Sequence, residues 1–102
     1  MPKERILVVE DEQDILELVR YNLSRENYKV FCASSGEEAL QIAASESLDL
    51  IVLDLMLPAD GRLWREAWLG LHQGIVDQGF KVVTHVPDEE NKLWHSVQVY
   101  HR

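Results

Sequence analysis

Residues 48–58, LDLIVLDLMLP, decide the fold of this chain. The segment opens with an almost continuous apolar run, residues 48–53, which is typical of a strand buried on both faces of a parallel sheet. Asp54 ends that run, and Pro58 stops the element that follows it. Leu55, Met56 and Leu57 do not make a helix start, so helix capping does not explain Asp54. A carboxylate between apolar neighbours therefore calls for a functional explanation.

The residues before this segment alternate between short apolar runs and helical patterns. Residues 5–9 (RILVV) and 29–33 (KVFCA) are predicted strands. Apolar stripes at helical spacing predict helices over about residues 13–26 and 36–46, the second opened by the capping box of Ser35 and Glu38. Strands that alternate with helices of this length predict right-handed βαβ units and a parallel sheet, an α/β fold.

Acidic residues follow two of the predicted strands. Glu10 and Asp11 come after the first strand and Asp54 after the third. In open parallel sheets, ligands bind beyond the carboxyl ends of the strands, so these acids meet if the two strands are neighbours. Carboxylates that converge need a cation, and oxygen-only ligands favour Mg²⁺. Glu12 and Asp14 are interpreted instead as acids at the start of the next helix.

The segments ILVVEDE (6–12) and DLIVLDLMLP (49–58) resemble the receiver domain of bacterial two-component response regulators, most closely the OmpR/PhoB type, over about residues 3–61. The resemblance implies that Asp54 accepts a phosphoryl group from a histidine kinase or another phosphodonor. It also implies that Asp11, helped by Glu10, holds Mg²⁺ together with Asp54 and the backbone carbonyl of Met56. The implied fold is flavodoxin-like, with five parallel strands in the order 2-1-3-4-5, and a receiver of this kind is not expected to be an enzyme.

The second part of the chain departs from the family pattern. We treat residues 1–102 as a single domain, family-like over 1–61 and divergent over 62–102. A helix over 62–77 and strands near 80–86 and 96–100 are predicted, with a turn or short helix between the two strands. Thr84, 30 residues after Asp54, is a candidate contact for the phosphoryl group, although strand propensity explains a threonine there equally well. Without a Lys-Pro pair or a fifth helix, the sheet should be incomplete or rearranged after the fourth strand.

Charge is distributed unevenly along the chain. The 102 residues carry 10 basic and 18 acidic side chains, a net charge of −8. All of it belongs to residues 1–60, which hold 13 acidic and 5 basic residues, while residues 61–102 hold 5 of each. This balance argues against direct nucleic-acid binding and against docking on an anionic membrane. No apolar run is long enough to span a bilayer. A single cysteine, Cys32, suits a cytoplasmic location.

Two functional hypotheses follow from these patterns. In the first, the chain is a receiver-like signalling domain that is phosphorylated on Asp54 with Mg²⁺. In the second, it is a receiver-derived, phosphorylation-deficient interaction or dimerisation module, such as a fragment or an engineered chimera. The lack of a last helix would leave one sheet face bare, and all three tryptophans lie after residue 60, so a homodimer is expected.

Overall fold

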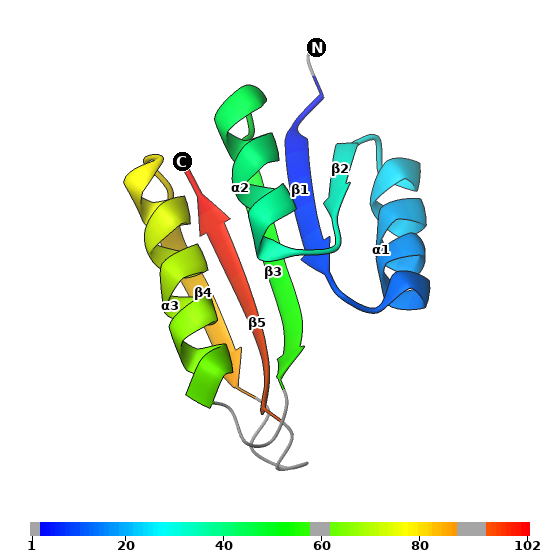
Figure 1. Ribbon diagram of the computed structural model, residues 1–102. Helices are drawn as coiled ribbons and strands as arrows, with labels where there is room; N and C mark the ends of the chain where they lie inside the picture. The colour runs from blue at the N-terminus through cyan, green and yellow to red at the C-terminus, as the bar shows by residue number, and fades with distance from the viewer. Residues whose placement is uncertain (1–2, 58–61, 88–93) are drawn as a thin grey trace.

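A computed structural model describes residues 3–57, 62–87 and 94–102 as a five-stranded sheet with helices on both faces (Figure 1). The elements in chain order are β1 (Arg5–Glu10), α1 (Gln13–Arg25), β2 (Lys29–Ala33), α2 (Gly36–Ser45), β3 (Leu50–Leu57), α3 (Arg62–Asp77), β4 (Lys81–Pro87) and β5 (Trp94–His101). The predicted elements of the first half match these to within a few residues. The chief difference is β3, which continues past Asp54 to Leu57.

The first three strands form the parallel part of the sheet. β1 pairs in parallel with β2 on one side and with β3 on the other. The β1–α1–β2 and β2–α2–β3 connections run in opposite directions across the sheet, and right-handed crossovers of opposite direction place their helices on opposite faces. The observed arrangement confirms the predicted α/β fold class.

The last part of the sheet is rearranged, as expected, and its strand order differs from the 2-1-3-4-5 arrangement that the family resemblance implies. The sheet has the order β2-β1-β3-β5-β4, and β5 runs antiparallel to both of its neighbours. Only six positions, 88–93, separate β4 from β5. A parallel return needs a crossover of a dozen or more residues, whereas an antiparallel return needs only a short loop. β5 therefore turns back beside β4 and enters the space between β4 and β3. The turn or short helix expected between these strands lies largely outside the described residues.

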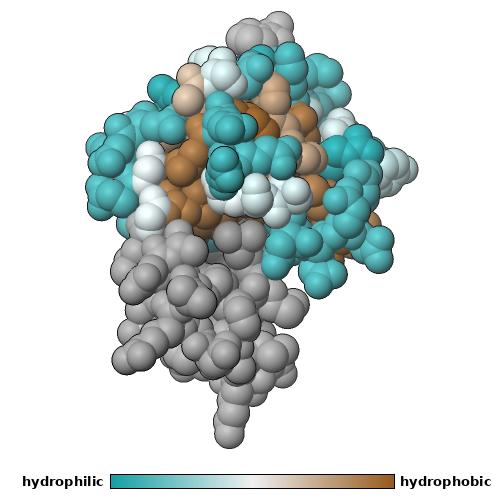
Figure 2. All heavy atoms as spheres, in the orientation of Figure 1, coloured by the Kyte–Doolittle hydropathy of each residue, from teal (hydrophilic) through white to brown (hydrophobic). Residues whose placement is uncertain are grey.

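A large apolar core lies between the sheet and the two helices α2 and α3, which face the viewer in Figure 1. Its members come from β1, β2, β3 and β5, from both helices and from the connections just before β3 and β4: Leu7, Val9, Ala33, Ala39, Ala43, Leu48, Ile51, Leu53, Leu71, Ile75, Phe80 and Tyr100. In the same orientation, Figure 2 shows hydrophobic surface in the middle of the coloured part of this face, rimmed by hydrophilic side chains. The three Trp side chains lie outside the described set.

The opposite face of the sheet has a smaller core beneath α1. Leu16 of α1 is buried against Ile6 and Val8 of β1. Val52 of β3 packs at the edge of this cluster and is only half-buried, as is Val99, its direct partner on β5. The helix α1 contacts β1 and β2, so this face is covered less completely than the one beneath α2 and α3.

Two helices pack closely because glycine lies at their contact. A Cβ on Gly74 of α3 would come within 2.8 Å of Leu40 Cδ2 of α2. A Cβ on Gly70, by contrast, would meet nothing within 4 Å. The glycine at position 74 is therefore explained by helix packing, whereas the one at position 70 carries only its cost in helix propensity.

The helix boundaries follow the expected local signals. The Ser35 hydroxyl accepts a hydrogen bond from the backbone N–H of Glu38 at 3.2 Å, which confirms the predicted N-cap of α2. Asn27 (φ 69°) follows the end of α1 and Gly79 (φ 97°) follows the end of α3. Both residue types tolerate the left-handed conformation that terminates helices.

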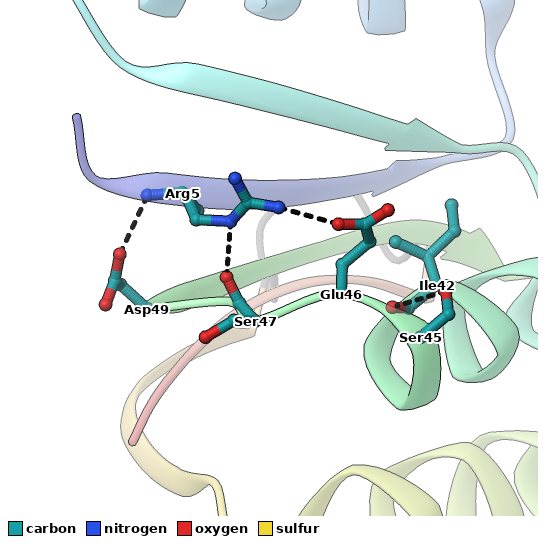
Figure 3. Close-up of polar contacts among 6 residues, drawn as sticks. All are labelled: Arg5, Ile42, Ser45, Glu46, Ser47 and Asp49. Carbon is teal, nitrogen blue, oxygen red and sulfur yellow. Dashed lines mark hydrogen bonds and ion pairs between the residues drawn. The ribbon is translucent and has the colours of Figure 1, made fainter. Parts of the chain in front are cut away.

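An arginine fastens the amino end of β1 to the α2–β3 connection (Figure 3). The Arg5 side chain donates to Glu46 Oε2 and to the carbonyl oxygen of Ser47, each at 2.6 Å, and its backbone N–H donates to Asp49 at 2.8 Å. The guanidinium also lies 4.9 Å from the centre of the Phe31 ring. These contacts position the start of β3 and thereby set its register against β1.

Candidate functional site

The carboxyl end of β1 lies beside the Asp54 position of β3, which continues three residues farther, and both strands point downward in Figure 1. We call this end of the parallel strands the carboxyl edge, and the end where they start the amino edge. The parallel register pairs Glu10 with Asp54, so these two positions are lateral neighbours on adjacent strands. Adjacent strands are about 4.8 Å apart, and laterally paired residues share a face of the sheet. The structure thus places the backbone positions of two of the acids predicted from the sequence side by side.

Glu10 is buried, with only 3% of its surface exposed. One of its carboxylate oxygens accepts the backbone N–H of Glu12 at 3.0 Å. Glu12 is the residue before α1, and its own side chain makes no capping hydrogen bond. The Glu10 carboxylate therefore tethers the turn between β1 and α1, and this turn carries Asp11 at the sheet edge with its side chain exposed to solvent.

Met56 lies two positions beyond Asp54 on the same strand. The pairing between β3 and β1 ends at Asp54, whereas the pairing between β3 and β5 continues to Leu57. Position 56 is in register with His95 of β5. The backbone of Met56 is thus at the same sheet edge as Glu10 and Asp54. Its expected function as a carbonyl ligand stays a prediction.

Thr84 is not brought next to Asp54. β5 lies between β3 and β4, so Thr84 is two strands away from Asp54. Its partner on β5 is Val99, which pairs with Val52 rather than with Asp54. Thr84 therefore lies both farther across the sheet and farther from its edge than the predicted contact requires. The strand order favours the alternative that this is an ordinary strand threonine.

The basic residue that follows β5 lies at the opposite end of the sheet. Arg102 Nε donates to the carbonyl oxygen of Leu48 at 2.8 Å, and the guanidinium lies 4.8 Å from the Phe80 ring centre. This arrangement follows from the antiparallel direction of β5, whose start, rather than its end, is beside Asp54. Arg102 consequently cannot supply positive charge to the acids at the carboxyl edge.

Sequence reasoning missed a buried polar cluster on the other side of the sheet. Tyr100 is completely buried, its hydroxyl donates to Gln98 Oε1, and His72 Nδ1 lies 2.8 Å from the same hydroxyl. Burial raises the pKa of Tyr100 to about 12. Little in the sequence signals this cluster, because Gln98 alternates with Val97 and Val99 and so fits the polar side of an ordinary strand. The cluster joins α3 to β5 and lies away from the carboxyl edge.

Metal-ligating side chains do not cluster elsewhere in the described part of the chain. Among the described side chains, which do not include that of Asp54, no three His, Cys, Asp or Glu side chains form a group able to hold a metal ion. Burial raises the pKa of the Cys32 thiol, as expected for a cysteine that packs in a core. None of the described helices is both long and apolar enough to cross a membrane.

Comparison with known proteins shows similarity over the first part of the chain. The response regulator receiver domain model matches residues 6–62, more than half of the chain. Over 54 residues the chain is 59% identical to the alkaline phosphatase synthesis transcriptional regulatory protein PhoP and 50% identical to the transcriptional regulatory protein YrkP, both of Bacillus subtilis (strain 168). These matches cover 53% of this chain but only 22% and 23% of the two relatives. The chain belongs to the response regulator receiver domain family.

Proposed function

We propose that the chain is a phosphoryl-accepting signalling domain and that Asp54 is the acceptor. The observation that carries the proposal is the direct register of Glu10 with Asp54 at the carboxyl edge of a parallel sheet, in a chain whose first half belongs to the receiver family. Ligands of open α/β folds bind at the carboxyl ends of the parallel strands, which is where this pair lies.

The donor set at this edge is chemically suited to Mg²⁺. Glu10, Asp11 and Asp54 offer carboxylate oxygens, and the Met56 backbone offers a carbonyl oxygen, which are the ligand types that this hard cation prefers. Bound there, the cation would offset the repulsion between the acids and neutralise charge on a phosphoryl group. Glu10 would act chiefly by holding the turn that presents Asp11, since one of its oxygens already accepts the Glu12 N–H.

The proposed reaction transfers a phosphoryl group from a phosphohistidine of a kinase, or from a small phosphodonor, to Asp54. A carboxylate oxygen of Asp54 forms a bond to phosphorus while the bond from phosphorus to the donor nitrogen breaks. The electron pair of the broken bond stays on the imidazole, and an acyl phosphate remains on Asp54. The chain would thus accept a signal rather than turn over a substrate, and we propose a cytoplasmic location in which kinase and receiver meet.

The antiparallel direction of β5 leads us to expect that phosphorylation of Asp54 is slow. β5 contributes no lysine or arginine to the carboxyl edge, because Arg102, the basic residue that follows it, lies at the opposite end of the sheet. Positive charge beside a transferring phosphoryl group is a major source of catalysis, so the proposed phosphorylation should be slow. The same observation supports the second candidate function, a receiver-derived interaction module that is not phosphorylated.

The test is incubation with acetyl phosphate or phosphoramidate, with and without Mg²⁺, followed by intact-mass analysis. The proposal expects slow, Mg²⁺-dependent gain of one phosphoryl group by the wild-type chain and no gain by Asp54→Asn. Asp49→Asn, an exposed aspartate at the opposite edge of the sheet, is the matched control and should gain phosphate like the wild type. No gain by the wild-type chain under any of these conditions would favour the interaction module.

A further inference from the structure

The solvent side of α1 carries an apolar pair flanked by opposite charges. The helix packs on the sheet through Leu16, Val19 and Leu23. At about 100° per residue, the positions that point directly away from this packed side are Asp14, Leu18, Tyr21 and Arg25, which we call the outer face of α1. Leu18 is 60% exposed and Tyr21 57% exposed, more than the other exposed large hydrophobic side chains in the described part of the chain.

Figure 1 shows α1 at one side of the molecule, with no other labelled element lying over its outer side. The helix is anchored by its buried stripe, so the outer face is presented on a fixed element rather than on a loop. Two large, neighbouring apolar side chains on a rigid helix form a surface suited to association with another helix.

The outer face is complementary to itself when two copies meet in antiparallel orientation. Leu18 and Tyr21 lie at equal distances from a midpoint between positions 19 and 20, half a residue from the centre of the helix, and so do Asp14 and Arg25. A two-fold axis through that midpoint therefore places Leu18 of one copy against Tyr21 of the other. The same axis places Asp14 of each copy against Arg25 of the other, so apolar groups meet at the centre and opposite charges meet at both ends.

The electrostatics of a helix support the same orientation. Asp14 is in the first turn of α1 and Arg25 in the last, each next to the helix end of opposite partial charge. In antiparallel packing, the positive end of each helix dipole also lies beside the negative end of the other, which is favourable. The Arg25 guanidinium lies 5.7 Å from the Tyr21 ring centre within one copy, so the charge is already held beside the apolar pair.

We propose that a second copy of this chain docks on the outer face of α1, forming a two-fold symmetric dimer with antiparallel α1 helices. The proposal commits to self-association and makes a different partner an alternative outcome. A contact through one helix is smaller than a standard protein interface, so the dimer should be weak. Because each copy carries a net charge of −8, salt that screens long-range repulsion should be present in the experiment.

Sedimentation velocity across a concentration series extending to several hundred micromolar tests the proposal. The wild-type chain should show a concentration-dependent monomer–dimer equilibrium. Leu18→Ser should abolish it, and circular dichroism should show that the variant remains folded, since Leu18 lies on the solvent side of the helix.

Reversing the charges at positions 14 and 25 tests the proposed orientation of the two helices more specifically. Asp14→Lys and Arg25→Glu should each weaken the dimer by about tenfold, because two symmetric attractions become repulsions. The double exchange should restore most of the wild-type affinity. Glu37→Lys is the matched control, since Glu37 is an exposed acid in the first turn of α2, and it should leave association unchanged. A monomer at every concentration, or single exchanges whose effects the double exchange does not reverse, would overturn the proposal.

Discussion

The Nε atom of Arg102 donates a hydrogen bond to the carbonyl oxygen of Leu48 at 2.8 Å. Arg102 comes directly after β5, and Leu48 comes two residues before β3. The backbone N–H of Arg102 also donates to the carbonyl oxygen of Asp49. These bonds fix the end of β5 at the amino edge of β3, the edge that Arg5 secures from the other side. The topology that separates this chain from an all-parallel sheet therefore depends in part on this pair.

Arg102→Ala should lower the free energy of unfolding by about 1 kcal/mol, because it removes a hydrogen bond to a charged group and the guanidinium contact with Phe80. Urea denaturation followed by circular dichroism measures the loss. Phosphorylation of the folded variant by a small phosphodonor should proceed as in the wild type. A large change in phosphorylation would mean that Arg102 acts at the acidic edge after all.

Tyr100→Phe should destabilise the fold by about 1–3 kcal/mol at neutral pH. The substitution takes the hydroxyl away from Gln98 Oε1 and from His72 Nδ1 while it keeps the ring in the core. Tyr21→Phe, on the exposed side of α1, is the matched control and should cost much less. Equal effects of the two substitutions would show that the buried hydroxyl contributes nothing.

The same tyrosine should make stability depend on alkaline pH. Burial raises the pKa of Tyr100 to about 12 in the folded chain, whereas an unfolded tyrosine ionises near 10. The folded-state pKa is the higher one, so its contribution is complete below about pH 10 and is lost as the pH rises toward 12. The loss amounts to about 2 to 3 kcal/mol. Denaturation curves between pH 8 and about pH 11.5 should show a decline in the wild type that is smaller in Tyr100→Phe.

Gly70→Ala should stabilise the chain by about 0.5–1 kcal/mol, because α3 gains helix propensity and the new Cβ meets nothing within 4 Å. Gly74→Ala gains the same propensity but forces Leu40 to move, so its effect should be less favourable than that of Gly70→Ala. Thermal or urea unfolding of the two variants gives the comparison. A larger gain at position 74 would contradict the close packing of α2 and α3.

Mg²⁺ affinity should depend on the acids at the carboxyl edge and not on the acids at the start of α1. Asp11→Ala should weaken Mg²⁺ binding by roughly tenfold or more, because the cation loses one of few protein ligands. Glu12→Ala should leave binding unchanged, since Glu12 is interpreted as a helix-end residue. Amide chemical shifts of residues 10 and 54 during Mg²⁺ titration report both. Identical titrations of wild type and Asp11→Ala would remove Asp11 from the site.

The first half of the fold could be predicted from the sequence because local and tertiary signals agree there. Apolar runs, the Ser35 cap and Asn27 mark the boundaries. Right-handed crossovers alone also allow the order 1-2-3, so the neighbouring positions of β1 and β3 were taken from the family resemblance. The Glu10–Asp54 pair then follows from the parallel register of these two strands.

The second half was predicted less well because its strand order depends on the length of the connection between β4 and β5. Residues 80–86 and 96–100 were predicted as strands, close to the observed β4 and β5, but the strand order was taken from the family pattern. The short connection at positions 88–93 forbids a parallel return and was the signal that could have corrected it. The expected place of Thr84 beside Asp54 depended on the same strand order, because it required β4 to neighbour β3.

The central claim, that the acidic edge of the sheet accepts a phosphoryl group on Asp54, is tested most directly by locating the modification. The chain is treated with phosphoramidate and Mg²⁺, reduced with borohydride, which converts an aspartyl phosphate to homoserine, and digested for tandem mass spectrometry. We predict homoserine at position 54, absent when Mg²⁺ is withheld. Homoserine at another aspartate, or none at position 54 in a sample that has gained phosphate, would contradict the account.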